Sequence, residues 1–419
     1  MPLPSPPPLS QPPSPSPSQP PLSPPSPSLS PLSQETRGAL VSAGLDPDAL
    51  VTLIRGAVAE DLPALPADPV ALLDATADAA VRTVSSYDPD SVDTTSVATV
   101  PPDLAGRGAV VARARGVVAG LPVAAAVFEV VLADRYPARH EPTGVRPTRD
   151  PSDVHRGDAA TDEHADAESG WTGGLDIEIV ASDGDQVSPG DAVLTVAGPV
   201  RALLTAERTA LNLLCHLSGV ATATRRWVDA VDGTGAAIRD TRKTLPGLRA
   251  LEKYAVRCGG GRNHRMSLAD AALVKDNHVV AAGGVTAAFA AVRARFPGLP
   301  VEVECDTVTQ VTEAVTAGAD LILCDNMSLD ELRESVAIAR PNGVELEASG
   351  GLTLDVARRV AETGVDYLAI GALTHSASAL DLGLDLALSP HFDAGLGTGT
   401  GTAAAADVAP AAGTGSGAS

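Results

Sequence analysis

The chain has 419 residues, of which 30 are Lys or Arg and 52 are Asp or Glu, so its formal net charge at pH 7 is -22. A hydrophobic content of 44% excludes a wholly disordered chain. The acidic balance excludes a general binder of nucleic acid or of anionic membranes, because phosphates would be repelled over most of the surface. An anionic ligand would therefore need a local basic pocket.

The lysines indicate where such a pocket could lie. The chain has only three, Lys243, Lys253 and Lys275, and all fall within one 33-residue stretch. The four cysteines show no CxxC spacing, which predicts buried, reduced thiols in a cytoplasmic protein.

The N-terminal half is expected to contain one folded region with two additions. Residues 1–33 are Pro, Ser and Leu-rich without a basic n-region, which predicts a disordered arm and no secretory signal. Helical spacing of apolar residues follows around residues 50–58, then a strand at Gly108–Arg115. The apolar run Gly116–Ala133 contains a proline and a glutamate and is too short to span a bilayer, so we expect two strands, or a strand and a helix. Residues 137–172 are polar and aperiodic, and we predict a disordered insertion.

The C-terminal half shows a regular alternation of elements. A β element at Asp183–Gly198 precedes a helix that we expect to begin at Thr205. Helical runs such as Leu329–Ala339 and Leu354–Glu362 then alternate with six apolar, strand-like runs, which predicts parallel strands with crossover helices. Six strands are too few for an eight-stranded barrel, so we expect an incomplete α/β barrel over residues 205–388. A Gly/Ala-rich tail at 389–419 is expected to be disordered. The predicted strands are Ala237–Asp240, Ala272–Lys275, Val301–Cys305, Leu321–Cys324, Val344–Glu347 and Tyr367–Ile370.

Charged side chains and glycines follow the predicted strands at their carboxyl ends, where βα barrels place their active sites. The cations suit a ligand with several negative groups, because the arginine fork matches carboxylates and phosphates. The carboxylates Glu304 and Asp325 could bind Mg²⁺, stabilise positive charge on a substrate, or act as general acid and base. The turn at Ser349–Gly350 together with Gly371 could hold a phosphate through backbone N–H groups. The concentrated cations are Arg208, Arg242, Lys243, Arg262, Arg265 and Lys275.

Several long motifs resemble those of the quinolinate phosphoribosyltransferase family, also called nicotinate-nucleotide pyrophosphorylases. The segments that carry the resemblance are Glu207–Thr222, Asp240–Arg265 (DTRKTLPGLRALEKYAVRCGGGRNHR), Leu273–Val279, Val301–Asp306, Leu323–Met327, Glu347–Leu352 and Gly371–Ala377. The resemblance implies an α/β fold with an incomplete α/β barrel of the type II phosphoribosyltransferase kind and an N-terminal α/β open-faced sandwich domain. The sandwich would cover residues 34–204, with a possible return of the C-terminus to it.

The resemblance also implies a reaction. Quinolinate and phosphoribosyl pyrophosphate would give nicotinate mononucleotide, pyrophosphate and CO₂ in NAD biosynthesis, with Mg²⁺ as cofactor. The family pairs its subunits head to tail, which implies a homodimer with shared active sites that can assemble further into a hexamer.

The roles that the resemblance assigns cover both substrates. Arg242, His264, Arg265 and Lys275 would bind quinolinate, with Arg208 reaching in from the partner subunit. Lys243 would lie near the pyrophosphate or the 5-phosphate. Glu304 and Asp325 would hold the ribose hydroxyls and Mg²⁺, and catalysis would rest on Lys243, Lys275, Glu304 and Asp325. The predicted 5-phosphate site consists of Ser349, Gly350, Gly371 and His375.

Two alternatives remain open at this stage. One is a paralogue that uses another pyridine base, such as nicotinate, which needs a clamp for only one carboxylate. The other is a non-catalytic relative kept for binding, although the intact lysines and acids argue against it. Glu252 and Lys253 in the LEKYAV motif are interpreted as packing and ion-pairing residues rather than substrate contacts, and His216 as a core or interface histidine.

Overall fold

The computed structural model describes residues 30–62, 92–136 and 175–388. The predicted insertion at 137–172, the predicted tail at 389–419 and residues 1–29 of the predicted arm lie outside these residues. Within the end of the arm, Leu32 is buried, and the hydroxyl of Ser33 caps the first helix by accepting from the Thr36 N–H. The folded chain therefore starts before residue 34.

The N-terminal domain is a sheet with one face covered by helices. Its four antiparallel strands lie in the order β12-β1-β5-β3. The last strand comes from the C-terminus, so the chain returns to this sheet after passing through the barrel, with Val110 opposite Leu384. A two-stranded ribbon, β2 with β4, lies beside it. The strands are β1 (Ala105–Ala112), β2 (Gly116–Val117), β3 (Asp176–Ile179), β4 (Gln186–Val187), β5 (Ala192–Pro199) and β12 (Leu382–Leu388).

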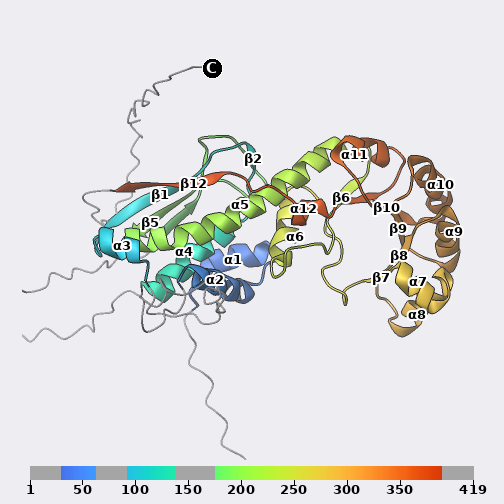
Figure 1. Cartoon of the computed structure of the whole chain (residues 1–419), viewed down its shortest axis with the longest axis horizontal. Coiled ribbons are helices and arrows are strands. Elements are labelled where there is room, and N and C mark those ends of the chain that lie inside the picture. Colours follow the sequence, from blue (N-terminus) through green and yellow to red (C-terminus); the bar gives the residue numbers. More distant parts are fainter. Residues whose placement is uncertain (1–29, 63–91, 137–174, 389–419) are drawn as a thin grey trace, which may run out of the picture.

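The helices of this domain pack in layers under the sheet (Figure 1). They are α1 (Gln34–Ser42), α2 (Pro47–Asp61), α3 (Thr94–Thr99) and α4 (Leu121–Arg135). Of the two predicted alternatives for Gly116–Ala133, a strand followed by a helix is confirmed. Almost all of α4 is apolar and buried, because α1 and α2 cover the side turned away from α5. None of the helices in the described ranges has both the length and the apolar character that a membrane span needs.

The C-terminal domain is an open, curved sheet of six parallel strands in the order β6-β11-β10-β9-β8-β7. The edge strands β6 and β7 do not pair with each other, so the predicted incomplete barrel is confirmed. All six predicted strands are present. They are β6 (Ala237–Arg239), β7 (Ala272–Val274), β8 (Val301–Cys305), β9 (Leu321–Asp325), β10 (Glu345–Ser349) and β11 (Tyr367–Ala369).

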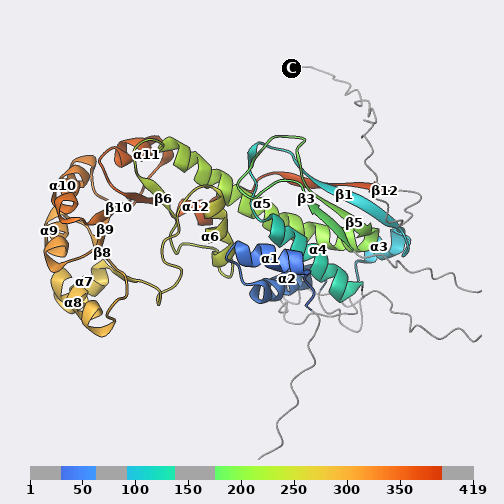
Figure 2. The same cartoon turned by 180° about the vertical axis from the view of Figure 1, so that it is seen from behind.

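Helices line the outer, convex side of this curved sheet (Figure 2). The α10 prediction matches to the residue, and α11 ends one residue earlier than expected, at Ala361. The helices on this side are α7 (Asp276–Ala282), α8 (Val285–Arg295), α9 (Val308–Ala317), α10 (Leu329–Ala339) and α11 (Leu354–Ala361), with a 3-10 turn at Arg340–Asn342. Two further helices, α6 (Arg249–Cys258) and α12 (Ala372–His375), lie instead against the long helix that connects the domains.

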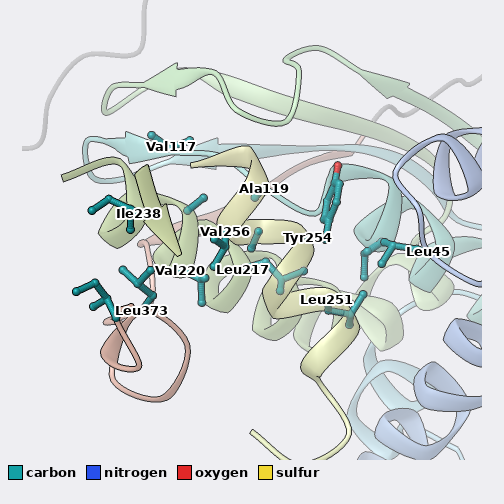
Figure 3. Packing of buried hydrophobic residues seen from close by; sticks show 14 of the residues in the cluster. Leu45, Val117, Ala119, Leu217, Val220, Ile238, Leu251, Tyr254, Val256 and Leu373 are labelled. Carbon is teal, nitrogen blue, oxygen red and sulfur yellow. The ribbon is translucent and has the colours of Figure 1, made fainter. Parts of the chain in front are cut away.

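One long helix, α5 (Val200–Ala230), connects the two domains (Figure 1). The prediction that it begins at Thr205 is wrong. Pro199 ends β5 and directly precedes the first helical residue, so the helix starts five residues earlier. Its first half covers the antiparallel sheet and its second half contacts α6, β6 and α11. Figure 3 shows Leu217 and Val220 of α5 close to Leu251 and Val256 of α6 in the core at this junction.

Candidate active site

Parallel strands bring their carboxyl ends to one edge of a sheet, and this edge carries most of the predicted site residues. Arg242 and Lys243 follow β6, Lys275 follows β7, and His375 ends the short helix after β11. Glu304 is the next-to-last residue of β8, Asp325 is the last residue of β9, and Ser349 ends β10. We call this edge the rim.

One cation of the rim has a buried donor without a partner. The buried Nε of Arg242 has no hydrogen-bond acceptor within the described residues. The pKa of Arg265 is lowered by burial and by the neighbouring charge of Arg242. Two guanidinium groups thus lie close together, and one of them has an unsatisfied buried donor. Such an arrangement favours binding of an anion, because a bound carboxylate would satisfy the donor and relieve the repulsion.

Lys243 is exposed, and its aliphatic stem lies against Gly371. A Cβ at Gly371 would come within 2.9 Å of Lys243 Cδ and 3.4 Å of His375 Nε2. The absence of a side chain at this position therefore lets Lys243 and His375 approach the same point of the rim. His375 Nδ1 lies 2.7 Å from the hydroxyl of Ser376, which orients the ring.

The two predicted carboxylates are near cationic and amide groups. Glu304 forms an ion pair with Lys275, and its side chain is 11% exposed. The amide Nδ2 of Asn326 donates to Asp325 at 2.7 Å. Carboxylate oxygens at an open edge are the donors that Mg²⁺ prefers, so Glu304 and Asp325 fit this ion chemically.

The turn after β10 is packed against the end of β9. Asn326 adopts a left-handed conformation with φ 54°, and its N–H donates to the Ser349 carbonyl at 2.9 Å. Gly350 has φ 92°, and a Cβ there would meet Asn326 Oδ1 at 2.2 Å. Only glycine fits this position, so the turn presents its backbone N–H groups in a fixed conformation, as a phosphate site requires.

Two predicted residues are not placed at the rim of this chain. Arg208 lies in the first half of α5, 64% exposed and 4.0 Å from its neighbour Glu207. It belongs to the N-terminal domain, so one chain does not assemble the full predicted set. His264 lies below the rim, where it is buried and contacts Glu302 through Nε2 at 2.6 Å.

The sequence interpretation missed the buried charges around His264. Glu302 and Glu347 are almost fully buried, and Arg239 forms an ion pair with Glu347. Burial and the charge of Glu302 raise the pKa of Glu347 to about 7. The alternation in the strand VEVEC could have predicted this group, since Glu302 must lie on the same face as Glu304.

The same group has the composition of a metal site, with His264, Glu302 and Glu347 close together. The hydrogen bonds of His264 argue against one. The Arg265 N–H donates to Nδ1 at 2.7 Å, so the ring proton is on Nε2, which donates to Glu302. A metal would need the lone pair of Nε2. Both ring nitrogens are thus engaged by the protein in this structure, and the contact of His264 with quinolinate stays a prediction.

A pocket of about 400 Å³ lies away from the rim, between α5, α12 and the segment that leads to β12. Its lining includes Arg115, Arg226, Trp227, Ser376 and Asp381. None of the predicted site residues lines it, although Ser376 contacts His375.

Comparisons with known proteins identify the family of this chain. The family model described as quinolinate phosphoribosyl transferase, C-terminal domain, matches residues 220–385, and the model of the N-terminal domain of the same family matches residues 163–218. The nicotinate-nucleotide pyrophosphorylase [carboxylating] of Mycobacterium leprae is 46% identical over 298 residues, which are 70% of this chain and 91% of that protein. The chain belongs to the quinolinate phosphoribosyl transferase family.

Solved structures of this family are similar to the chain over both domains. The nicotinate-nucleotide pyrophosphorylase from Francisella tularensis has a TM-score of 0.62 at 29% identity, and the match covers 82% of this chain and 98% of that one. NadC from Streptococcus pyogenes has a TM-score of 0.60 at 34% identity, covering 78% of this chain and 100% of that one. The predicted family and fold class are confirmed.

Proposed function

We propose that this protein transfers the phosphoribosyl group of phosphoribosyl pyrophosphate to quinolinate, with loss of CO₂, and so supplies nicotinate mononucleotide for NAD biosynthesis. The observation that carries the proposal is the pair Arg242 and Arg265, with one unsatisfied buried donor, close to a rim that also holds two carboxylates, the turn at Gly350, and Gly371. Family membership supports the same reaction.

The residues of the rim divide between the two substrates. Arg242, His264, Arg265 and Lys275 bind quinolinate, and His264 Nδ1 also accepts from the backbone N–H of Arg265. Ser349, Gly350, Gly371 and His375 receive the 5-phosphate. Lys243 lies beside Gly371 and neutralises the phosphate groups.

The chemistry needs charge stabilisation rather than a protein nucleophile. The ring nitrogen of quinolinate attacks the ribose C1 while pyrophosphate departs, so positive charge develops on the ribose. Glu304 and Asp325 stabilise that charge, and Lys243 stabilises the leaving group. The bond from the ring to the 2-carboxylate then breaks, and its electron pair remains on the ring carbon next to the cationic nitrogen until a proton replaces the CO₂.

Mg²⁺ belongs to the proposal as the cofactor. Glu304 and Asp325 would hold it, directly or through water, and when bound it neutralises charge on the pyrophosphate. The ion pair between Lys275 and Glu304 leaves Asp325 as the carboxylate without a cationic partner among the described residues.

The complete site also needs a second subunit. Arg208 is exposed on the N-terminal domain, away from the rim of its own chain, so we propose a homodimer in which Arg208 enters the partner's site; further assembly to a hexamer is compatible with this. Mixing Arg208→Ala with Lys275→Ala protein should restore about a quarter of wild-type activity, because one of the two sites in each hybrid dimer is intact. No recovery despite proven subunit exchange would contradict the shared site.

The cellular location that we propose is the cytoplasm. The four cysteines are free in the structure, and burial raises the pKa of Cys324 to about 12, which keeps this thiol unreactive.

The direct test uses purified full-length protein with phosphoribosyl pyrophosphate, Mg²⁺ and either quinolinate or nicotinate. The proposal predicts nicotinate mononucleotide from quinolinate, and at most about 1% of that rate from nicotinate, since one carboxylate contact is then missing. A faster reaction with nicotinate would establish the paralogue, and no product from either base would contradict an enzyme of this class.

A further inference from the structure

Helix α6 is buried around most of its circumference at residues 251–256, although three of these six residues are polar. Glu252 and Lys253 are fully buried, and Tyr254 is nearly so. Each of the three side chains reaches a different part of the molecule. An unpaired charge in the interior has a large free-energy cost, so the partners of these buried side chains should explain why they are present.

We propose that Glu252 and Lys253 are positioning residues, each of which holds one of the two loops that present cations at the rim. The inference rests on the proposed function, because it concerns the same site. Neither side chain reaches the rim itself, so each acts through the backbone of a loop.

Glu252 holds the loop of residues 241–248, which carries Arg242 and Lys243. Its Oε2 accepts from the Leu245 N–H at 3.1 Å, and its Oε1 lies 2.9 Å from His216 Nε2 on α5. Residues 241–248 lie between β6 and α6 and belong to neither a helix nor a strand. A fully buried carboxylate thus fixes the loop to the long helix that connects the domains.

Two further side chains fix the same loop from other directions. The Thr374 hydroxyl donates to the Lys243 carbonyl at 2.8 Å, and Arg249 Nε donates to the Thr244 hydroxyl at 3.0 Å. Three side chains from different elements thus bind consecutive parts of one loop. They hold Lys243 in one position before substrate binds, which is the condition for electrostatic stabilisation of a transition state.

Lys253 holds the loop of residues 259–265 in the same way. Its Nζ forms an ion pair with Asp240 and donates to the His264 carbonyl at 2.9 Å. Asp240 also accepts from the His264 N–H at 2.8 Å and from the Asn263 side chain. The backbone of His264, directly before Arg265, is therefore fixed at its N–H to Asp240 after β6 and at its carbonyl to Lys253 of α6.

Tyr254 provides a matched control on the same helix. Its hydroxyl donates to Asp183, in the loop before β4, and in Figure 3 the ring projects from α6 toward the strands of the N-terminal domain. This contact stabilises the junction of the domains without touching either loop. Tyr254→Phe should therefore reduce thermal stability and leave the kinetics of the folded enzyme unchanged.

The experiment compares Glu252→Ala, Glu252→Gln and Tyr254→Phe in the full-length enzyme, with kcat and both KM values measured below each variant's unfolding temperature. Glu252→Ala should lower kcat/KM by about 10- to 100-fold, since displacing a charged group by about 1 Å has effects of this size. Glu252→Gln should restore most of that loss, because the amide oxygen can still accept from the Leu245 N–H and its NH₂ can donate to His216.

The results of this experiment distinguish a failure of the positioning role from a failure of the proposed function. An inactive wild-type enzyme would contradict the function itself. With an active wild type, equal kinetics for Glu252→Ala and Tyr254→Phe at similar loss of melting temperature would overturn the positioning role. If Glu252→Ala does not fold, Thr374→Val removes another anchor of the same loop: a higher KM for phosphoribosyl pyrophosphate would support the inference, and unchanged constants would overturn it.

Discussion

The two sheets of this protein differ in what they bury. The antiparallel sheet of the N-terminal domain buries aliphatic residues such as Val110, Leu194 and Val196, and keeps its ion pair between Arg107 and Asp176 in solvent. Inside and below the parallel sheet lie Asp240, Glu302 and Glu347, each less than 5% exposed. The antiparallel sheet thus has an aliphatic interior with an exposed ion pair, whereas carboxylates are buried at the parallel sheet.

The difference follows from what each region has to hold in place. Aliphatic packing fixes a sheet but does not orient a loop, because it has no directionality. Hydrogen bonds to buried charges are directional and strong, and they lie directly beneath the loops that carry Arg242, Lys243 and Arg265. The parallel sheet therefore gives up part of its stability to pre-organise the rim.

Removing one charge of the buried pair should have the largest effect on stability. Lys253→Met leaves Asp240 charged and unpaired in the core, so the free energy of unfolding should fall by about 3–5 kcal/mol in urea denaturation. The double variant Asp240→Asn with Lys253→Met should recover at least half of that loss. Leu194→Ala, in the other sheet, should cost about 2–5 kcal/mol, with no rescue from Asp240→Asn. A loss below about 1 kcal/mol for Lys253→Met would remove the contrast between the sheets.

Removing a charge from the rim should affect activity and leave stability unchanged. Lys243→Met keeps the stem that packs on Gly371 and loses the ammonium, so kcat should fall by about 10²- to 10³-fold, with little change in melting temperature. Arg107→Met, at an exposed pair of the N-terminal sheet, is the control and should alter neither quantity. Similar activity in the two variants would show that Lys243 has no role in the reaction.

Two glycines with similar backbone conformations allow a finer comparison. Gly350 and Gly190 have φ values of 92° and 97°, but a Cβ collides with Asn326 only at Gly350. Gly190→Ala should cost about 1–2 kcal/mol for the left-handed conformation alone, with normal activity. Gly350→Ala should cost more and should also raise the KM for phosphoribosyl pyrophosphate. Equal effects on stability and KM would mean that the packing of this turn is unimportant.

The buried carboxylates predict a smaller, pH-dependent effect. Because the pKa of Glu347 is raised to about 7, the folded state binds more protons than the unfolded state between about pH 4.5 and 7. Stability from this group is therefore present at low pH and is lost as pH rises through 7. Glu347→Gln should flatten that part of the pH profile. A profile identical to wild type would contradict the raised pKa.

Much of the fold could be predicted from the sequence, because apolar strands and amphipathic helices alternate at regular spacing in residues 237–370. Helix α10 matched to the residue, and its start is marked by Ser328 with Glu331 three positions later. The start of α5 was missed, since the helical pattern near Thr205 gave no sign that the helix extends back to Pro199. Strand β10 was predicted at Val344–Glu347, which is one residue too early at its start and two residues too early at its end. The apolar Val344 precedes the strand.

The candidate site could be predicted only in part. The residues at strand ends were found because their positions follow from the topology. The ion pair between Arg239 and Glu347 was not found, because sequence does not show that the two side chains meet in the fold. The interpretation of Lys253 as an ion-pairing residue is confirmed by its pair with Asp240, although the sequence did not identify that partner. The protein partners of His264 show the same limit, because sequence does not show that its ring lies between Glu302 and the Arg265 N–H.

The most direct test of the account uses quinolinate labelled in its 2-carboxyl group, with phosphoribosyl pyrophosphate and Mg²⁺. The account predicts release of labelled CO₂, pyrophosphate and nicotinate mononucleotide in equal amounts, dependent on both substrates, and a loss of about 100-fold or more in Lys243→Met. Label retained in the nucleotide, or CO₂ released without phosphoribosyl pyrophosphate, would contradict it.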